Sequence, residues 1–189
     1  MIIEEKTLES EMIYEGAIIN LRHDRVTVKD GKSSWREIVE HNGGVAIAAV
    51  TDEGRMVVVK QYRKAAGRAM IEVPAGKTEP GECHRLTAER ELREETGYSA
   101  GSLEYLTGFY SSIGYSTEFI HLYLATGLAP GETDFDENEA IEVYEHTPDE
   151  ILSMAESGLA ADAKTIIAAQ IVKLRQACRP DTPVEAGRA

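Results

Sequence analysis

The segment from Gly76 to Tyr98 constrains the fold of this chain more than any other part of the sequence. It begins with a glycine-containing loop, continues with Ala88 and Leu92 four residues apart, and reaches Gly97 after the last charged residues. This order predicts a loop and then a helix that turns one apolar face to the core. Gly97 is expected to end the helix, because glycine readily adopts the left-handed conformation of a helix C-terminal cap.

The same helix carries three acids on one stripe. At 100° per residue, Glu91 and Glu95 lie about 40° apart, and Glu94 lies about 60° from Glu91 on the other side. Like charges at this spacing destabilise a helix by a few tenths of a kcal/mol per pair, roughly, unless something positive lies among them. A hard cation with oxygen ligands is the natural occupant, and magnesium suits phosphate chemistry best. The alternative is a solvated acidic helix surface, where an acid such as Glu95 contributes little to stability.

The whole segment resembles the signature box of the Nudix hydrolases. That box reads Gly, five residues, Glu, seven residues, then Arg-Glu-apolar-x-Glu-Glu-x-Gly and an apolar residue. Its fixed positions are filled here by Gly76, Glu82, Arg90, Glu91, Leu92, Glu94, Glu95 and Gly97. Tyr98 replaces the usual aliphatic residue at the last position. The resemblance implies an α+β fold, a Nudix-type α/β/α sandwich with a mixed sheet.

The resemblance also implies roles for the residues of the box. The metal ligands would be the carbonyl of Ala75 and the carboxylates of Glu91, Glu94 and Glu95, holding Mg²⁺ with Mn²⁺ as a substitute. Glu94 and Glu95 would also be catalytic, and Arg90 would join them in an orienting role. Glu82 lies at the helix start, where an acid is stabilising for dipole reasons alone, so a structural role competes with one near the metal.

An acidic loop at 136–139 resembles one found in ADP-ribose pyrophosphatases, a subgroup of the family. There a glutamate activates or positions the attacking water, which implies a catalytic role for Glu139 here, with Glu137 second. The alternative is a solvated acidic loop. The subgroup is also similar in Gln61-Tyr62-Arg63 followed by Glu72-Val73-Pro74-Ala75-Gly76, which implies that Arg63 and Glu72 bind substrate. Arg63 would contact a phosphate, unless it is an ordinary surface arginine.

Three further positions bear on the substrate. Trp35 is the only tryptophan, and in relatives that hydrolyse ADP-ribose a tryptophan at a similar place stacks on adenine, sometimes from the partner subunit; simple packing is the alternative. Gly114 and Glu118 keep the subgroup's pattern and are expected to bind substrate. Ile113 replaces the proline of that pattern, so other nucleoside diphosphate sugars become candidates.

Composition restricts the class of partner. The chain has 189 residues and a formal net charge of −13, which argues against nucleic acid as the main partner. It has no long apolar run and no signal peptide, so no membrane association is expected and the cytoplasm is the expected location. The two cysteines lack metal-ligand spacing and suggest no disulfide framework.

The chain is expected to divide into three parts. Residues 1–42 should form a small antiparallel sheet, with extended runs at 12–14, 17–19 and 25–28 and a hairpin at Asp30-Gly31. Because that sheet has too few apolar residues for its own core, it is expected to pack on the rest of the chain or to form a homodimer. Residues 43–178 would be the Nudix domain and 179–189 a flexible tail. Strands are expected at 44–50, 55–62, 71–73, 103–110, 119–125 and 141–145, and helices at 148–156 and 161–177.

The expected activity is Mg²⁺-dependent hydrolysis of the pyrophosphate linkage of ADP-ribose, to AMP and ribose 5-phosphate, or of a related nucleoside diphosphate sugar. The alternatives are a Nudix enzyme for another substrate, such as GDP-mannose or dinucleoside polyphosphates, and a non-catalytic module that senses ADP-ribose. Such sensors tend to lose acids of the box, and this chain keeps them all.

Overall fold

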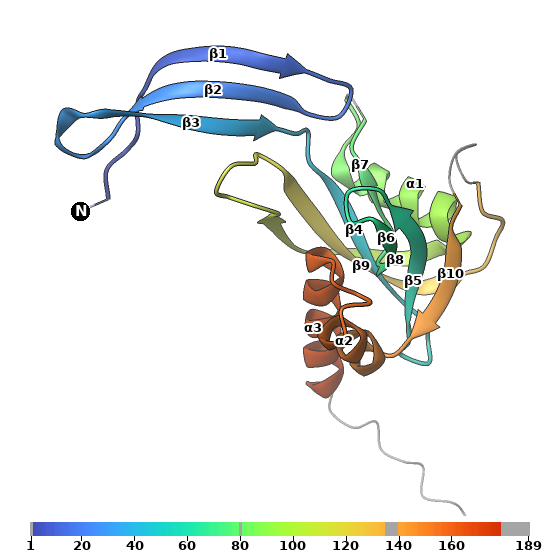
Figure 1. The fold of residues 1–189 in the computed structure, drawn as a ribbon. Coiled ribbons are helices and arrows are strands. Elements are labelled where there is room, and N and C mark those ends of the chain that lie inside the picture. The colour runs from blue at the N-terminus through green and yellow to red at the C-terminus, as the bar shows by residue number, and fades with distance from the viewer. Residues whose placement is uncertain (1, 80, 135–139, 179–189) are drawn as a thin grey trace, which may run out of the picture.

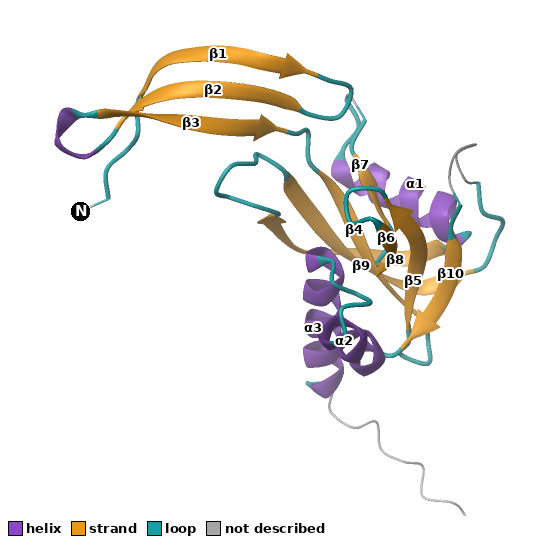
Figure 2. Ribbon diagram, viewed as in Figure 1, coloured by secondary structure: helices purple, strands orange, loops and turns teal. Residues whose placement is uncertain are grey.

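The computed structural model describes residues 2–79, 81–134 and 140–178, which form two separate sheets and three α-helices (Figure 1; Figure 2). The smaller sheet extends away from the main body, which holds the larger sheet and all three helices (Figure 1). No helix in the described residues is long and apolar enough to cross a membrane. The tail predicted at 179–189 lies outside the described residues.

The smaller sheet is antiparallel, as the sequence predicts. Its order is β1 (Thr7–Glu15), β2 (Asn20–Thr27) and β3 (Ser33–Glu40). Asp30 and Gly31, with φ of 62° and 70°, make the predicted turn between β2 and β3. The extended run predicted at 17–19 is wrong, because these residues form the turn between β1 and β2. There the Gly16 N–H donates to the Ile19 carbonyl, and local turn hydrogen bonds outweigh the β propensity of the apolar side chains.

The larger sheet has the strand order β10-β5-β4-β9-β8, with β6 paired to β5 and β7 paired to β4. The strands are β4 (Gly44–Val50), β5 (Met56–Arg63), β6 (Arg68–Glu72), β7 (Ala75–Lys77), β8 (Ser99–Tyr110), β9 (Phe119–Ala129) and β10 (Glu142–His146). The β4–β9 pair is parallel and the other pairs are antiparallel, so the sheet is mixed, as predicted. The short β7 was not predicted; its Ala-Gly-Lys sequence has no strand signal, and backbone pairing with β4 alone makes it a strand.

Both faces of the larger sheet are covered by helices. Val45, Ile47 and Ala49 of β4 pack with α1 (His84–Thr96), whereas Ala46 and Ala48 pack with α2 (Pro148–Glu156) and α3 (Ala163–Ala177). Alternate residues of a strand point to opposite faces, so an unbroken apolar run is what a strand buried on both sides requires. The α/β/α sandwich expected from the sequence is confirmed.

The helix ends follow the sequence signals closely. Gly97 adopts φ of 75°, and its N–H donates to the Arg93 carbonyl at 2.8 Å, as predicted for the end of α1. Thr147 and Glu150 form the capping box of α2. The third helix begins at Ala163 rather than at 161, because the Asp162 side chain accepts the Thr165 N–H and serves as the N-terminal cap.

The smaller sheet is attached to the loop between β8 and β9. The Val39 N–H donates to the Tyr115 carbonyl at 2.7 Å, and the Thr117 N–H donates to the Val39 carbonyl at 3.0 Å. The His41 N–H donates to Oγ1 of Thr117 at 2.9 Å. The end of β3 therefore brings the N-terminal segment to the loop that holds Gly114 and Glu118.

Candidate active site

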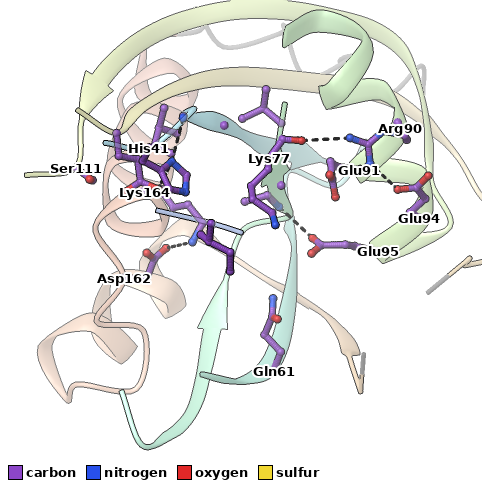
Figure 3. Close-up of a pocket in the computed structure, with 18 of the residues that line it drawn as sticks. His41, Gln61, Lys77, Arg90, Glu91, Glu94, Glu95, Ser111, Asp162 and Lys164 are labelled. Carbon is purple, nitrogen blue, oxygen red and sulfur yellow. Dashed lines mark hydrogen bonds and ion pairs between the residues drawn. The ribbon is translucent and has the colours of Figure 1, made fainter. Parts of the chain in front are cut away.

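A cavity of about 650 Å³ lies where α1 and the start of α3 meet residues of β4, β5, β7 and β9 (Figure 3). In Figure 3 the acids of α1 lie on one side, and Asp162 and Lys164 of the α3 end lie on the other. Of the residues assigned from the sequence, the cavity is lined by Arg63, Ala75, Arg90, Glu91, Glu94, Glu95 and Glu118. The structure thus brings together assigned residues from four separate segments of the chain.

The loop of the box is pressed against α1. A β-carbon on Gly76 would lie 1.9 Å from the carboxyl carbon of Glu91, so only glycine fits at this point. The Ala75 N–H donates to Oε2 of Glu95 at 3.0 Å, and the Ile47 N–H donates to the Pro74 carbonyl at 2.8 Å. The backbone at Ala75 is therefore held between the helix and β4.

Glu95 differs from its sequence interpretation in one respect. It is only 4% exposed, whereas the helical pattern indicated a surface acid. The reason is the packing of the glycine loop over α1, which covers Glu95 and gives its carboxylate the Ala75 N–H as a donor. The helical spacing of the acids predicts that they share one face of the helix, but it does not predict which segment covers that face.

Arg90 lies among the acids and bonds to three of them. Its Nη1 donates to Glu91 Oε1 and to Glu94 Oε2, both at 2.8 Å, and its Nε and Nη2 donate to the two oxygens of Glu82, both at 3.2 Å. The hydrogen bond from Arg90 is the main cause that lowers the pKa of Glu82 to about 2, and that same bond raises the pKa of Arg90. Thr87 Oγ1 also donates to Glu82 at 2.8 Å. Glu82 thus has the contacts of a structural residue, and the arginine has those of an orienting one.

The donor set at this wall suits a hard divalent cation. Glu91, Glu94 and Glu95 supply only oxygen, and the loop that carries the Ala75 carbonyl packs directly on Glu91. In the described part of the chain, however, no three Asp, Glu, His or Cys side chains converge closely enough to enclose a metal ion. Glu91 and Glu94 both bond to Arg90 Nη1, whereas Glu95 accepts the Ala75 N–H. The metal-ligand assignment therefore stays a prediction that fits the site in its chemistry.

The wall opposite the acids is built around Glu72. This carboxylate is 2% exposed and accepts bonds from Arg63 Nε at 2.7 Å, Arg63 Nη2 at 2.8 Å and Lys164 Nζ at 2.7 Å. Burial alone would raise the pKa of Glu72, but the hydrogen bonds from Arg63 and the charge of Lys164 outweigh it and hold the pKa below its usual range. Arg63 and Lys164 line the cavity. Glu72, assigned to substrate binding from the sequence, lies behind them and holds them in place.

The other predicted substrate residues are spread more widely. Glu118 lines the cavity with His41, whose Nδ1 lies 3.6 Å from the Glu118 carboxylate. Gly114 lies in the loop between β8 and β9, outside the set of residues that line the cavity. Trp35 lies on β3, 45% exposed and 4.3 Å from the His23 ring between centroids, and it does not line the cavity of its own chain. Glu137 and Glu139 lie outside the described residues.

Several residues at the cavity were not found from the sequence. They are Ile18, His41, Lys77, Ser111, Asp134, Asp162 and Lys164. Ile18 reaches the cavity because the turn between β1 and β2 approaches it, and a lone apolar residue in a turn gives no signal of that kind. The sequence indicates the position of Lys164 only indirectly. Asp162, two residues earlier, is a typical N-terminal cap and marks where α3 begins.

Comparison with known proteins agrees with this fold. Residues 40–170 match the NUDIX domain family, and residues 5–39 match the nucleoside diphosphate sugar hydrolase N-terminal domain. The chain belongs to the Nudix family. It is 46% identical over 177 residues to a Bacillus subtilis (strain 168) protein named ADP-ribose pyrophosphatase, covering 93% of this chain and 96% of that protein.

Two other relatives carry different names. A Bacillus methanolicus protein named methanol dehydrogenase activator is 43% identical, covering 94% of this chain and 97% of its own length. A Cronobacter sakazakii (strain ATCC BAA-894) protein named GDP-mannose pyrophosphatase is 33% identical, covering 82% of this chain and 87% of its own. A solved structure titled as an ADP compounds hydrolase superposes with a TM-score of 0.82 at 19% identity, over 95% of this chain and 99% of that one. That likeness shows the shared fold.

Proposed function

We propose that the protein hydrolyses the pyrophosphate linkage of ADP-ribose, giving AMP and ribose 5-phosphate, or that of a related nucleoside diphosphate sugar. The observation that carries the proposal is the cavity with acids on one wall and two cations on the other. Its volume of about 650 Å³ suits a ligand of nucleotide size. The relative named ADP-ribose pyrophosphatase, 46% identical over nearly the whole chain, supports this choice of substrate.

The proposed cofactor is Mg²⁺, with Mn²⁺ as a substitute. Glu91, Glu94, Glu95 and the Ala75 carbonyl would hold it, and when bound it neutralises phosphate charge and lowers the pKa of water. Arg90 orients the acids through its bonds to Glu91 and Glu94.

The chain's own residues supply binding and proton transfer. The guanidinium of Arg63 receives the diphosphate, because its planar fork suits phosphate oxygens. We assign Glu139 as the residue that takes the proton from the attacking water, with Glu137 as the second choice. This assignment rests on the resemblance of the acidic loop, since both glutamates lie outside the described residues.

The small N-terminal sheet supports the further proposal of a homodimer. Leu8, Met12, Ile13, Tyr14 and Trp35 are all exposed on it, so the sheet offers apolar side chains to an interface between two chains. In the dimer, Trp35 of one subunit would stack on the adenine held by its partner. Sedimentation at micromolar concentration should give the mass of two chains, and a monomer would contradict the proposal.

The relatives and the site also bear on the alternative functions. The relative named GDP-mannose pyrophosphatase makes that sugar nucleotide the next substrate to consider, before dinucleoside polyphosphates. The relative named methanol dehydrogenase activator suggests a regulatory role. The alternative of an ADP-ribose sensor points the same way. All acids of the box are retained, and Glu91, Glu94 and Glu95 line the cavity, which favours hydrolysis. We also propose that the protein acts in the cytoplasm and that its substrate is a nucleotide rather than a nucleic acid.

The test is a substrate panel. Purified protein with Mg²⁺ is incubated with ADP-ribose, GDP-mannose, UDP-glucose and diadenosine polyphosphates, and the products are separated by chromatography. We expect fastest cleavage of ADP-ribose, with AMP as a product. Faster cleavage of another sugar nucleotide would change the substrate but keep the mechanism, whereas ADP-ribose binding without turnover of any compound would favour the sensor.

A further inference from the structure

The cavity wall opposite α1 holds two cations that share one buried carboxylate. Arg63 comes from the end of β5 and Lys164 from the first turn of α3, and both line the cavity. Glu72, at the end of β6, accepts two bonds from Arg63 and one from Lys164 at 2.7 to 2.8 Å. It therefore connects a strand residue and a helix residue that are far apart in the sequence.

Glu72 holds the guanidinium of Arg63 by one edge. The Nε and Nη2 donors lie on the same edge of the planar group and both bond to Glu72. The Nη1 group therefore lies on an edge turned away from that carboxylate. The Arg63 side chain is 44% exposed, so an anion in the cavity can meet it while the bonds to Glu72 persist.

Lys164 is fixed more tightly than Arg63. Its Nζ lies 2.7 Å from Glu72 Oε2 and 3.0 Å from Asp162 Oδ2, and its side chain is 14% exposed. Asp162 is itself fixed, because it accepts the N–H and the O–H of Thr165 at 3.1 and 2.6 Å. An ammonium held between two carboxylates in this way is poorly placed to swing out to a substrate. Its effect on the cavity therefore passes through Glu72.

The charges on this wall depend on the lysine. Arg63 and Lys164 are balanced by Glu72 and Asp162, so loss of Lys164 leaves the wall one unit more negative, next to a substrate whose diphosphate is itself anionic. Glu72 would also lose one of its three charge-assisted bonds, and its buried carboxylate could turn and take Arg63 with it.

We propose that Lys164 is a positioning residue: through Glu72 it holds Arg63 in the orientation that receives the diphosphate of the substrate. The part of this inference that concerns the substrate rests on the proposed function. The part that concerns Arg63 does not, because it follows from the contacts of Glu72 alone.

The kinetic test compares Lys164→Met and Lys164→Arg with Lys173→Met as a matched control. Lys173 lies on the same helix and pairs with a carboxylate, Asp149, at 2.5 Å, but does not line the cavity. We expect Lys164→Met to raise KM for ADP-ribose about tenfold and to leave kcat within about twofold. Lys164→Arg should recover most of the affinity, and Lys173→Met should behave as wild type. Equal KM in Lys164→Met and wild type, or a fall of kcat alone, would overturn the inference.

A second readout needs no substrate. The Arg63 Nε–H gives a ¹⁵N NMR signal, identified by its loss in Arg63→Lys, and the bond to Glu72 should protect it from exchange with water. We expect protection in wild type, Lys164→Arg and Lys173→Met, and its loss in Lys164→Met. If that pattern appears while the wild-type protein cleaves no sugar nucleotide, the proposed function fails and the positioning role stands. An Arg63 signal equally protected in Lys164→Met would overturn the positioning role whatever the kinetics.

Discussion

Replacing Gly76 with alanine should separate the activity of the site from the stability of the fold. The added β-carbon would lie 1.9 Å from Cδ and 2.3 Å from Oε2 of Glu91, whereas ordinary contact begins at 3.4 Å. The Glu91 carboxylate must therefore retreat by about 1.5 Å. Because Glu91 reaches this point with a flexible side chain, we expect the unfolding free energy to fall by only about 1 kcal/mol. A displacement of this size at the reacting centre should lower kcat/KM for ADP-ribose about 100-fold.

The assay pairs initial rates of AMP release with thermal unfolding followed by circular dichroism. Gly31→Ala is the matched control: Gly31 has φ of 70° and nothing within 4 Å of an added β-carbon. An alanine held in this left-handed conformation should lower the unfolding free energy by about 1 kcal/mol, while the activity stays at the wild-type level. Full activity in Gly76→Ala would refute the reasoning that the loop glycine keeps Glu91 in its working position.

Three other variants test separate parts of the structure. Thr165→Val removes the buried acceptor of the Val73 N–H, a bond of 2.9 Å, and should lower the unfolding free energy by about 1–3 kcal/mol in urea; an unchanged midpoint would count against that bond. Arg63→Ala should raise KM for ADP-ribose at least about tenfold, and an unchanged KM would remove Arg63 from the binding site. For Glu82, the bond from Arg90 lowers the pKa from 4.5 to about 2, so its stabilisation is present above about pH 4.5 and is lost as pH falls toward 2. Glu82→Gln should therefore lose less stability than wild type over that range in an acid titration followed by circular dichroism, and equal losses would contradict the assignment.

Much of the fold was predictable because its signals are local. The continuous apolar run of β4 indicated a strand buried on both faces, and the structure places α1 on one face and α3 on the other. Gly97 and the Thr147–Glu150 pair marked helix ends through their own backbone chemistry. The prediction for residues 17–19 was wrong because local side-chain signals are only part of what sets the backbone. The apolar side chains there indicated a strand, but hydrogen bonds across the turn decided the conformation.

The site was predictable on one wall only. The spacing of Glu91, Glu94 and Glu95 along a helix placed them together, because helical geometry relates residues close in sequence. Lys164 and Glu72 meet across 92 positions of the chain, and no pattern in the sequence brings α3 to the end of β6. The burial of Glu95 was missed likewise, since it depends on how the glycine loop crosses the helix.

The most direct test of the account compares wild type with Glu95→Gln. Glutamine keeps an oxygen that can accept the Ala75 N–H but lacks the charge, so the fold should survive although Glu95 is buried. With Mg²⁺ and ADP-ribose, we expect wild type to release AMP and ribose 5-phosphate, and Glu95→Gln to release neither while its melting temperature changes by no more than a few degrees. AMP release by the variant at the wild-type rate, or no product from wild type, would contradict the claim that the acids of α1 serve pyrophosphate hydrolysis.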